Sequence, residues 1–167
     1  MIRINNIKID VLSDNKETII KKIEIELKEK VIDYKIVKKS IDARKEFTDE
    51  LKNKGIQNSK DFAALTNILT KAWSGYSVKE YKNLKNLKKE SLRDNMTNME
   101  LVLNMLAEVS STEISKSKKE KGYVAAESSV INGGTIAKTA KEQIEKETGT
   151  KIVTSANNIN VKQIDNK

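Results

Sequence analysis

The chain is 167 residues long, with 37% hydrophobic, 34% charged and only 4% aromatic residues, so it can build one modest core or two smaller ones from Ile, Leu, Val and Met. It contains no Cys and no His, which excludes disulfides, the usual zinc sites, thiolate nucleophiles and triads with a histidine base. We therefore expect no enzyme, no cofactor, no metal and no small-molecule substrate. The formal net charge of +8 favours acidic partners, nucleic acid first among them.

Residues 1–45 are predicted to form a small β-α-β piece. Residues 2–11 alternate apolar and polar side chains, as strands do, and the phase slips at Asn5-Asn6, which indicates a bulge or a tight turn. The run Val31 to Val37 alternates again and predicts a second strand. Between them, caps at 13–15 precede a helical face formed by Ile19, Ile20, Ile23 and Leu27. Such a piece buries too little surface to stand alone.

The N-terminus carries no feature of a targeting or membrane segment. The start, MIRINNIKIDV, has no unbroken hydrophobic stretch, so we expect no secretory signal. No apolar run approaches the roughly 20 residues that a membrane helix requires. We therefore expect a cytoplasmic protein without membrane contact.

Two stretches of this N-terminal piece, MIRINNIKIDV and YKIVKKSIDARKE (34–46), resemble the extreme N-terminus of a family of uncharacterised bacterial FAD-dependent dehydrogenases. In that family a small α/β piece precedes a large flavin-binding domain. The fingerprint G-x-G-x-x-G, which would hold the pyrophosphate after a strand, is absent, and the only paired glycines are Gly133-Gly134. The resemblance of residues 1–46 therefore implies no flavin and no oxidoreductase activity in this chain.

From residue 46 the pattern turns helical. A short charged helix, Glu46 to Lys54, is expected to end at Gly55, because glycine favours the left-handed conformation that follows many helices. Asn58 and Ser59 are expected to cap a second helix, whose apolar face ends at Trp73.

Two capping boxes open the next two helices. Ser77-Val-Lys-Glu80 begins a helix that we expect to run from Val78 to Arg93. Thr97-Asn-Met-Glu100 begins a second helix, Met99 to Val109, which is apolar nearly all round. A helix of that character is expected to be the buried centre of this region.

The C-terminal third is expected to hold one more helix and a tail. The polar run from Ser115 to Tyr123 should be exposed, and Gly133-Gly134 should turn the chain into a last helix, Thr135 to Thr148, which Gly149 ends. The remaining residues have little apolar content. We therefore expect a mainly α fold with three parts: a β-α-β piece at 1–45, a helical region at 46–149 and a flexible tail at 150–167.

The predicted helix from Val78 to Arg93 is the best candidate interaction surface. It carries few acids, and its basic side chains are the candidate nucleic-acid-binding residues: Lys79, Lys82, Lys85, Lys88, Lys89 and Arg93. Contacts of these groups with phosphates would weaken steeply with salt. Because Arg occurs only at positions 3, 44 and 93, electrostatic attachment is favoured over reading of bases. The alternative is that the lysines are solvated outer positions of a packed helix.

Two other features have both a binding and a structural interpretation. Trp73, Tyr76 and Tyr81 would stack on unpaired bases or anchor a small core. The run Gly133-Gly134-Thr135 would hold a phosphate on its backbone N–H groups or form a plain turn before a helix, and it lacks the G-K-[ST] of a P-loop. The structural interpretation is favoured in both cases.

Three blocks resemble the C-terminal half of the DNA-damage-inducible protein D (DinD) family, in that family's order. They are GYSVKEYKNLKNLKKESLRDNMTNMELVLNMLAEVSSTEIS (75–115), INGGTIAKTAKEQIEKETGTKIVTS (131–155) and NVKQIDN (160–166). The resemblance extends from about residue 47 to the C-terminus. A domain related to BRO-type phage antirepressor modules usually precedes this region in the family, and residues 1–46 stand in its place here.

This resemblance implies a bacterial DNA-damage (SOS) response and a nucleoprotein setting, and it supplies no catalytic residues. The preferred interpretation is a non-enzymatic DinD-type protein that acts through nucleic acid or a DNA-bound protein partner. Two alternatives stay open. One is a truncated or chimeric relative of an FAD-dependent oxidoreductase without activity, and the other is a phage-antirepressor-like regulator that acts by protein contacts.

Overall fold

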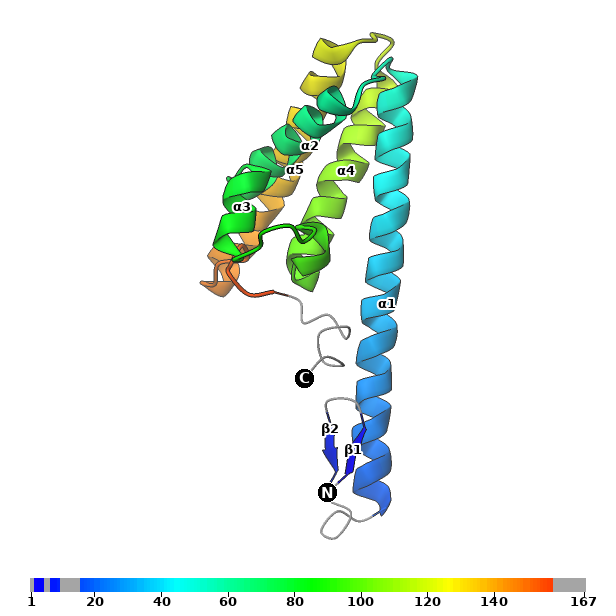
Figure 1. Ribbon diagram of the computed structural model, residues 1–167, viewed down its shortest axis with the longest axis vertical. Coiled ribbons are helices and arrows are strands. Elements are labelled where there is room, and N and C mark those ends of the chain that lie inside the picture. The colour runs from blue at the N-terminus through cyan, green and yellow to red at the C-terminus, as the bar shows by residue number, and fades with distance from the viewer. Residues whose placement is uncertain (1, 5–6, 10–15, 158–167) are drawn as a thin grey trace. The chain divides into compact units, whose positions relative to one another are not determined.

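The computed structural model describes residues 2–4, 7–9 and 16–157, and most of these residues lie in helices (Figure 1). The predicted mainly α fold class is thereby confirmed. The chain divides into two compact units, Met1–Lys38 and Lys39–Lys167. Within the described ranges, no helix combines the length and the apolar character that crossing a membrane demands.

The first unit contains two short strands and the start of a long helix. Strand β1 (Ile2–Ile4) pairs antiparallel with strand β2 (Ile7–Ile9), with Arg3 opposite Lys8. Helix α1 (Lys16–Asn53) begins in this unit and continues without a break into the second.

The predicted strand at Val31–Val37 is wrong, because these residues belong to α1. The stretch 16–53 contains no Gly and no Pro and is rich in Lys and Glu, so it favours a helix throughout and outweighs a short alternating pattern. A separate helix start at Glu46 is wrong for the same reason, whereas the predicted end before Gly55 is confirmed. The expected turn at Asn5-Asn6 and the caps at 13–15 lie outside the described residues.

The second unit builds one core from helices. After the end of α1, its elements are α2 (Ser59–Ser74), α3 (Val78–Leu84), a short 3-10 helix (Arg93–Asn95), α4 (Asn98–Ser117) and α5 (Tyr123–Thr148). Helix α5 packs along both α4 and α2 (Figure 1). The largest fully buried side chains include Trp73, Tyr81, Phe47, Leu65, Leu69 and Leu103.

The predicted helix starts are confirmed where a capping side chain marks them. Asn58 Oδ1 accepts the backbone N–H of Asp61 at 2.8 Å, at the start of α2. Both capping boxes form, one across Ser77–Glu80 and the other across Thr97–Glu100. A cap joins groups only three residues apart, so the local sequence is enough to specify it.

The start predicted for the last helix is wrong, because α5 already begins at Tyr123 and contains Gly133-Gly134. A Cβ atom on Gly133 would lie 2.1 Å from Ser111 Oγ and 2.4 Å from the backbone nitrogen of Ser111, on α4. A Cβ atom on Gly134 would lie 2.4 Å from the Cβ of Ala72, on α2. The glycines therefore mark the close approaches of α5 to its two neighbours, and the expected turn or phosphate cradle is not formed.

The helix predicted from Val78 to Arg93 is also wrong, because α3 ends at Leu84 and the 3-10 helix follows separately. Asn86 takes a positive φ of 56° in the intervening turn. Tyr81 and Leu87 are both buried. On a continuous helix two residues six positions apart would point roughly 120° away from each other. The turn at Asn86 allows both to face the core.

Helix α4 buries polar side chains and exposes apolar ones. The prediction of a buried apolar centre holds for Leu101, Leu103 and Ala107, but Met99, Val102 and Val109 are 45%, 36% and 42% exposed. Its buried polar side chains are Glu100, Asn104, Glu108, Ser111, Thr112 and Ser115. Buried polar groups are costly unless they are hydrogen-bonded, so this face must be paired with its surroundings. The helix also extends to Ser117, beyond the start of the segment expected to be exposed.

The described part of the C-terminal tail, residues 150–157, is hydrogen-bonded to the helical body. The backbone N–H of Thr154 donates to Glu100 Oε1 at 3.2 Å, and Asn157 Nδ2 donates to the carbonyl oxygen of Lys85 at 3.2 Å. The predicted tail is therefore held against the body up to Asn157. Its remaining residues, 158–167, lie outside the described residues.

Candidate functional site

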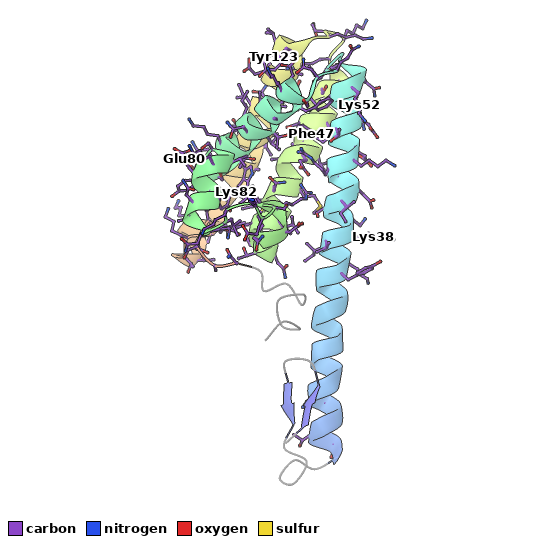
Figure 2. The ribbon with its side chains drawn as sticks, in the orientation of Figure 1. Lys38, Phe47, Lys52, Glu80, Lys82 and Tyr123 are labelled. Atoms are coloured by element: carbon purple, nitrogen blue, oxygen red, sulfur yellow. The ribbon has the colours of Figure 1, made fainter. Side chains whose placement is uncertain are left out.

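The six predicted nucleic-acid-binding residues do not form one basic face. Lys79, Lys88 and Lys89 are exposed. Lys82 and Arg93 are half-buried, and Lys85 is buried. On α3 itself, Glu80 and Lys82 point to different sides (Figure 2). Only the three exposed lysines stand where a macromolecule has free access to them.

Lys85 is a structural residue, so its assignment to the basic surface is corrected. Its side chain is 1% exposed, and its ammonium group lies 2.8 Å from the equally buried carboxylate of Glu100. The same ammonium group donates to the carbonyl oxygen of Ala156 and lies 5.6 Å from the ring centroid of Tyr81. A charge held in this way cannot reach a phosphate without breaking the core.

Glu100 joins three segments of the second unit. Besides Lys85, it accepts the N–H of Thr97 at 2.7 Å, as part of the capping box, and the N–H of Thr154 from the tail. Burial raises the pKa of the adjacent Tyr81 phenol far above its ordinary value, and the negative charge of Glu100 raises it further. Among the residues that the structure describes, the Tyr81 hydroxyl has no partner at hydrogen-bond distance, so Glu100 acts on it through its charge.

Arg93 is likewise committed to a buried carboxylate, that of Glu108 on α4. Its two terminal nitrogens lie 2.8 and 3.1 Å from the two Glu108 oxygens, and one of them also donates to the carbonyl oxygen of Ser40. Arg44 of α1 reaches the same carboxylate at 3.3 Å and donates to Thr66 Oγ1 at 2.9 Å. Two guanidinium groups thus share one fully buried negative charge, which leaves this cluster with an excess of positive charge.

A cavity of about 350 Å³ opens beside this cluster. Its lining residues come from the C-terminal part of α1, from α2, α3, the 3-10 helix and α4, and from Ser91 and Met96, and all of them belong to the second unit. The polar and charged side chains that line it include Arg44, Thr66, Lys82, Arg93, Asn104 and Glu108. The half-buried Lys82 therefore lines this cavity, whereas the exposed Lys79, Lys88 and Lys89 do not.

Trp73 and Tyr81 are core residues, as the structural interpretation predicts, and do not form a surface for stacking bases. Both are fully buried, their rings meet edge to face at 6.1 Å, and Trp73 Nε1 donates to Asn104 Oδ1 at 3.2 Å. Tyr76 is 39% exposed and stacks at a tilt on Tyr81, 6.0 Å between centroids. A strand of bases could not reach the two buried rings.

The residues that sequence reasoning missed are the buried acids of α4 and their partner Arg44. Glu100, Asn104 and Glu108 recur every four residues in a stretch otherwise dominated by apolar side chains. That spacing places them on one side of a helix and could have indicated a buried polar seam. Among the residues that the structure describes, no group of three or more acidic side chains is arranged to hold a metal ion.

Comparison with known proteins adds one match. A protein-family model described as a domain of unknown function (DUF8436) matches residues 1–48. The match covers the two strands and most of α1, and of the site described above it includes only Ser40 and Arg44. No curated protein and no solved structure matches the chain.

Proposed function

We propose that the protein is a non-enzymatic participant in a bacterial DNA-damage response, located in the cytoplasm, and that it acts through nucleic acid or a DNA-bound protein. The resemblance of its blocks to the DinD family motivates the setting. The observation that supports a direct contact with nucleic acid is the exposure of Lys79 on α3 and of Lys88 and Lys89 in the segment that follows it; these three residues are here named the α3 lysine surface.

The α3 lysine surface differs from the buried basic residues beside it in being open to solvent. None of its three lysines forms an ion pair with a residue in the described part of the chain, in contrast to Lys85 and Arg93. The neighbouring acids Glu80 and Glu90 accept backbone N–H groups, at 2.7 Å from Ser77 and 2.7 Å from Lys88. Solvated ammonium groups of this kind attach to phosphates and release counterions.

Replacing Lys79, Lys88 and Lys89 together with Gln is expected to weaken binding to single- and double-stranded DNA and to flatten its salt dependence. The slope of log affinity against log salt should fall by about 0.9 for each lost contact with B-DNA and by about 0.7 for each lost contact with a single strand. If all three contacts exist, they alone weaken wild-type duplex binding about 40-fold between roughly 50 and 200 mM salt. Fluorescence anisotropy with labelled oligonucleotides measures both quantities.

The matched control replaces Lys60, Lys119 and Lys121 with Gln. These exposed lysines lie on α2 and in the connection between α4 and α5, they form no ion pair in the described part of the chain, and the change in net charge is the same. The control variant should bind DNA nearly as the wild type does. If both variants lose the same affinity, total charge rather than this surface drives binding. If the wild type does not bind at low salt, direct contact with nucleic acid is contradicted.

A second candidate function is regulation by protein contact, and the exposed side of α4 favours it. Met99, Val102 and Val109 follow one another at spacings of three and seven residues, which places them on one side of the helix. Apolar side chains grouped in this way are typical of surfaces that meet a protein partner. The DNA titration separates the two candidates, since only the first requires the α3 lysine surface.

A further inference from the structure

The cavity beside the arginine cluster carries more positive than negative charge. Three cationic side chains line it, Arg44, Lys82 and Arg93, against the single carboxylate of Glu108. The two arginines already surround that carboxylate. Lys82 forms no direct ion pair with any residue that the structure describes, although Glu90 lies near enough to interact with its charge, so its ammonium group is the cation of the cavity that no carboxylate binds.

The size and the walls of the cavity suit a small molecule or the end of a chain. Its volume of about 350 Å³ lies within the range of roughly 300–1,000 Å³ that is usual for ligand sites. Val78, Leu92 and Met96 supply an apolar side, and hydroxyl groups of Thr66, Thr70 and Ser91 lie among the lining residues. A ligand with one anionic end and a less polar remainder fits this division.

We infer that the cavity binds a phosphate group. A phosphate monoester carries a charge of about −1.5 to −2 near neutral pH and has three strongly accepting oxygens. That charge matches the excess of two positive charges on the lining, whereas a carboxylate would match only half of it. Arg guanidinium groups favour such planar, multidentate contacts, and Lys82 adds a point charge.

This inference goes beyond the proposed contact with nucleic acid and does not depend on it. The phosphate group has two sources, a free phosphate compound or the 5′ end of a nucleic-acid strand. Because the cavity and the α3 lysine surface use different side chains, one site can fail its test while the other passes.

The test is titration of the full-length chain with inorganic phosphate, followed by NMR of the arginine Nε–Hε groups and the backbone amides at constant ionic strength. We expect saturable shifts of Arg44 and Arg93. Lys82→Gln should weaken the binding about tenfold, the loss expected for one charge-assisted hydrogen bond. Lys82→Arg should keep it, and Lys60→Gln, an exposed position on α2 outside the cavity and outside the α3 lysine surface, should change it by no more than about twofold.

Shifts that grow linearly without saturation, or equal binding by wild type and Lys82→Gln, would overturn the inference. The backbone spectrum shows whether Lys82→Gln is folded, and the half-buried position of Lys82 makes loss of the fold an unexpected result. Competition between inorganic phosphate and oligonucleotides with a 5′-phosphate or a 5′-hydroxyl then identifies the source. Displacement by the phosphorylated strand alone assigns a strand end, and displacement by neither assigns a free phosphate compound.

Discussion

Lys85→Met is expected to destabilise the second unit by about 3–5 kcal/mol, the usual result of removing one partner of a buried ion pair. The substitution keeps the length and most of the volume of the side chain, but it leaves the fully buried carboxylate of Glu100 without its cation. It also removes the donor to the carbonyl oxygen of Ala156. Urea unfolding followed by the fluorescence of Trp73, the only Trp in the chain, measures the change in the same core.

The double variant Lys85→Met, Glu100→Gln is expected to recover most of that loss. It removes both buried charges, and Gln at position 100 can still accept the N–H of Thr97, since Gln serves in capping boxes as Glu does. The control is Lys89→Met, an exposed lysine in the same segment, which should change stability by no more than about 0.5 kcal/mol. A Lys85→Met protein as stable as the wild type would show that the ammonium group does not lie beside Glu100.

Gly133→Ala is expected to lower the free energy of unfolding by about 2–3 kcal/mol, in the upper part of the range for overpacking. Alanine has a higher helix propensity than glycine by about 1 kcal/mol, so a glycine without close neighbours would respond in the opposite direction. Here the added methyl group would lie 2.4 Å from the backbone nitrogen of Ser111, and α4 would have to move away. Thermal or urea unfolding shows directly whether the free energy of unfolding falls or rises.

Two further variants show what the methyl group meets. Adding Ser111→Ala to Gly133→Ala relieves the contact of 2.1 Å with the hydroxyl oxygen but not the contact with the backbone, so only part of the stability should return. Thr135→Ala, an exposed position on α5, should be nearly neutral. If Gly133→Ala stabilised the protein, α4 and α5 could not approach as closely as the structure indicates.

The helix ends that a capping side chain or a glycine marks were predictable, because the groups that specify them lie close together along the chain. The Asn58 cap, the capping boxes at Ser77–Glu80 and Thr97–Glu100, and the left-handed Gly149 after α5 all agree with the structure. The extent of α1 was not predicted, because an alternation over a few residues was given more weight than a long stretch without a helix breaker.

The candidate site was predicted less well, because sequence spacing does not show which lysine meets a carboxylate from another element. Lys79, Lys82 and Lys85 have the same side chain and neighbouring positions, yet one is exposed, one lines a cavity and one is buried. The difference comes from Glu100 on α4 and from the tail at Ala156, both remote in the sequence. Arg93 likewise forms an ion pair with Glu108, a residue of a different element.

The sequence by itself determined the composition, the mainly helical class, the absence of Cys and His, and the capped ends of helices, since each depends on residue content or on contacts within one turn. Only the tertiary structure decided which charges are buried, that Gly133-Gly134 serve helix packing, and that a cationic cavity exists. These depend on side chains brought together from separate elements, where a buried charge is stable only beside its partner. Of the six basic residues predicted to form one surface, only three lysines are exposed, because residues from other elements pair with or enclose the other three.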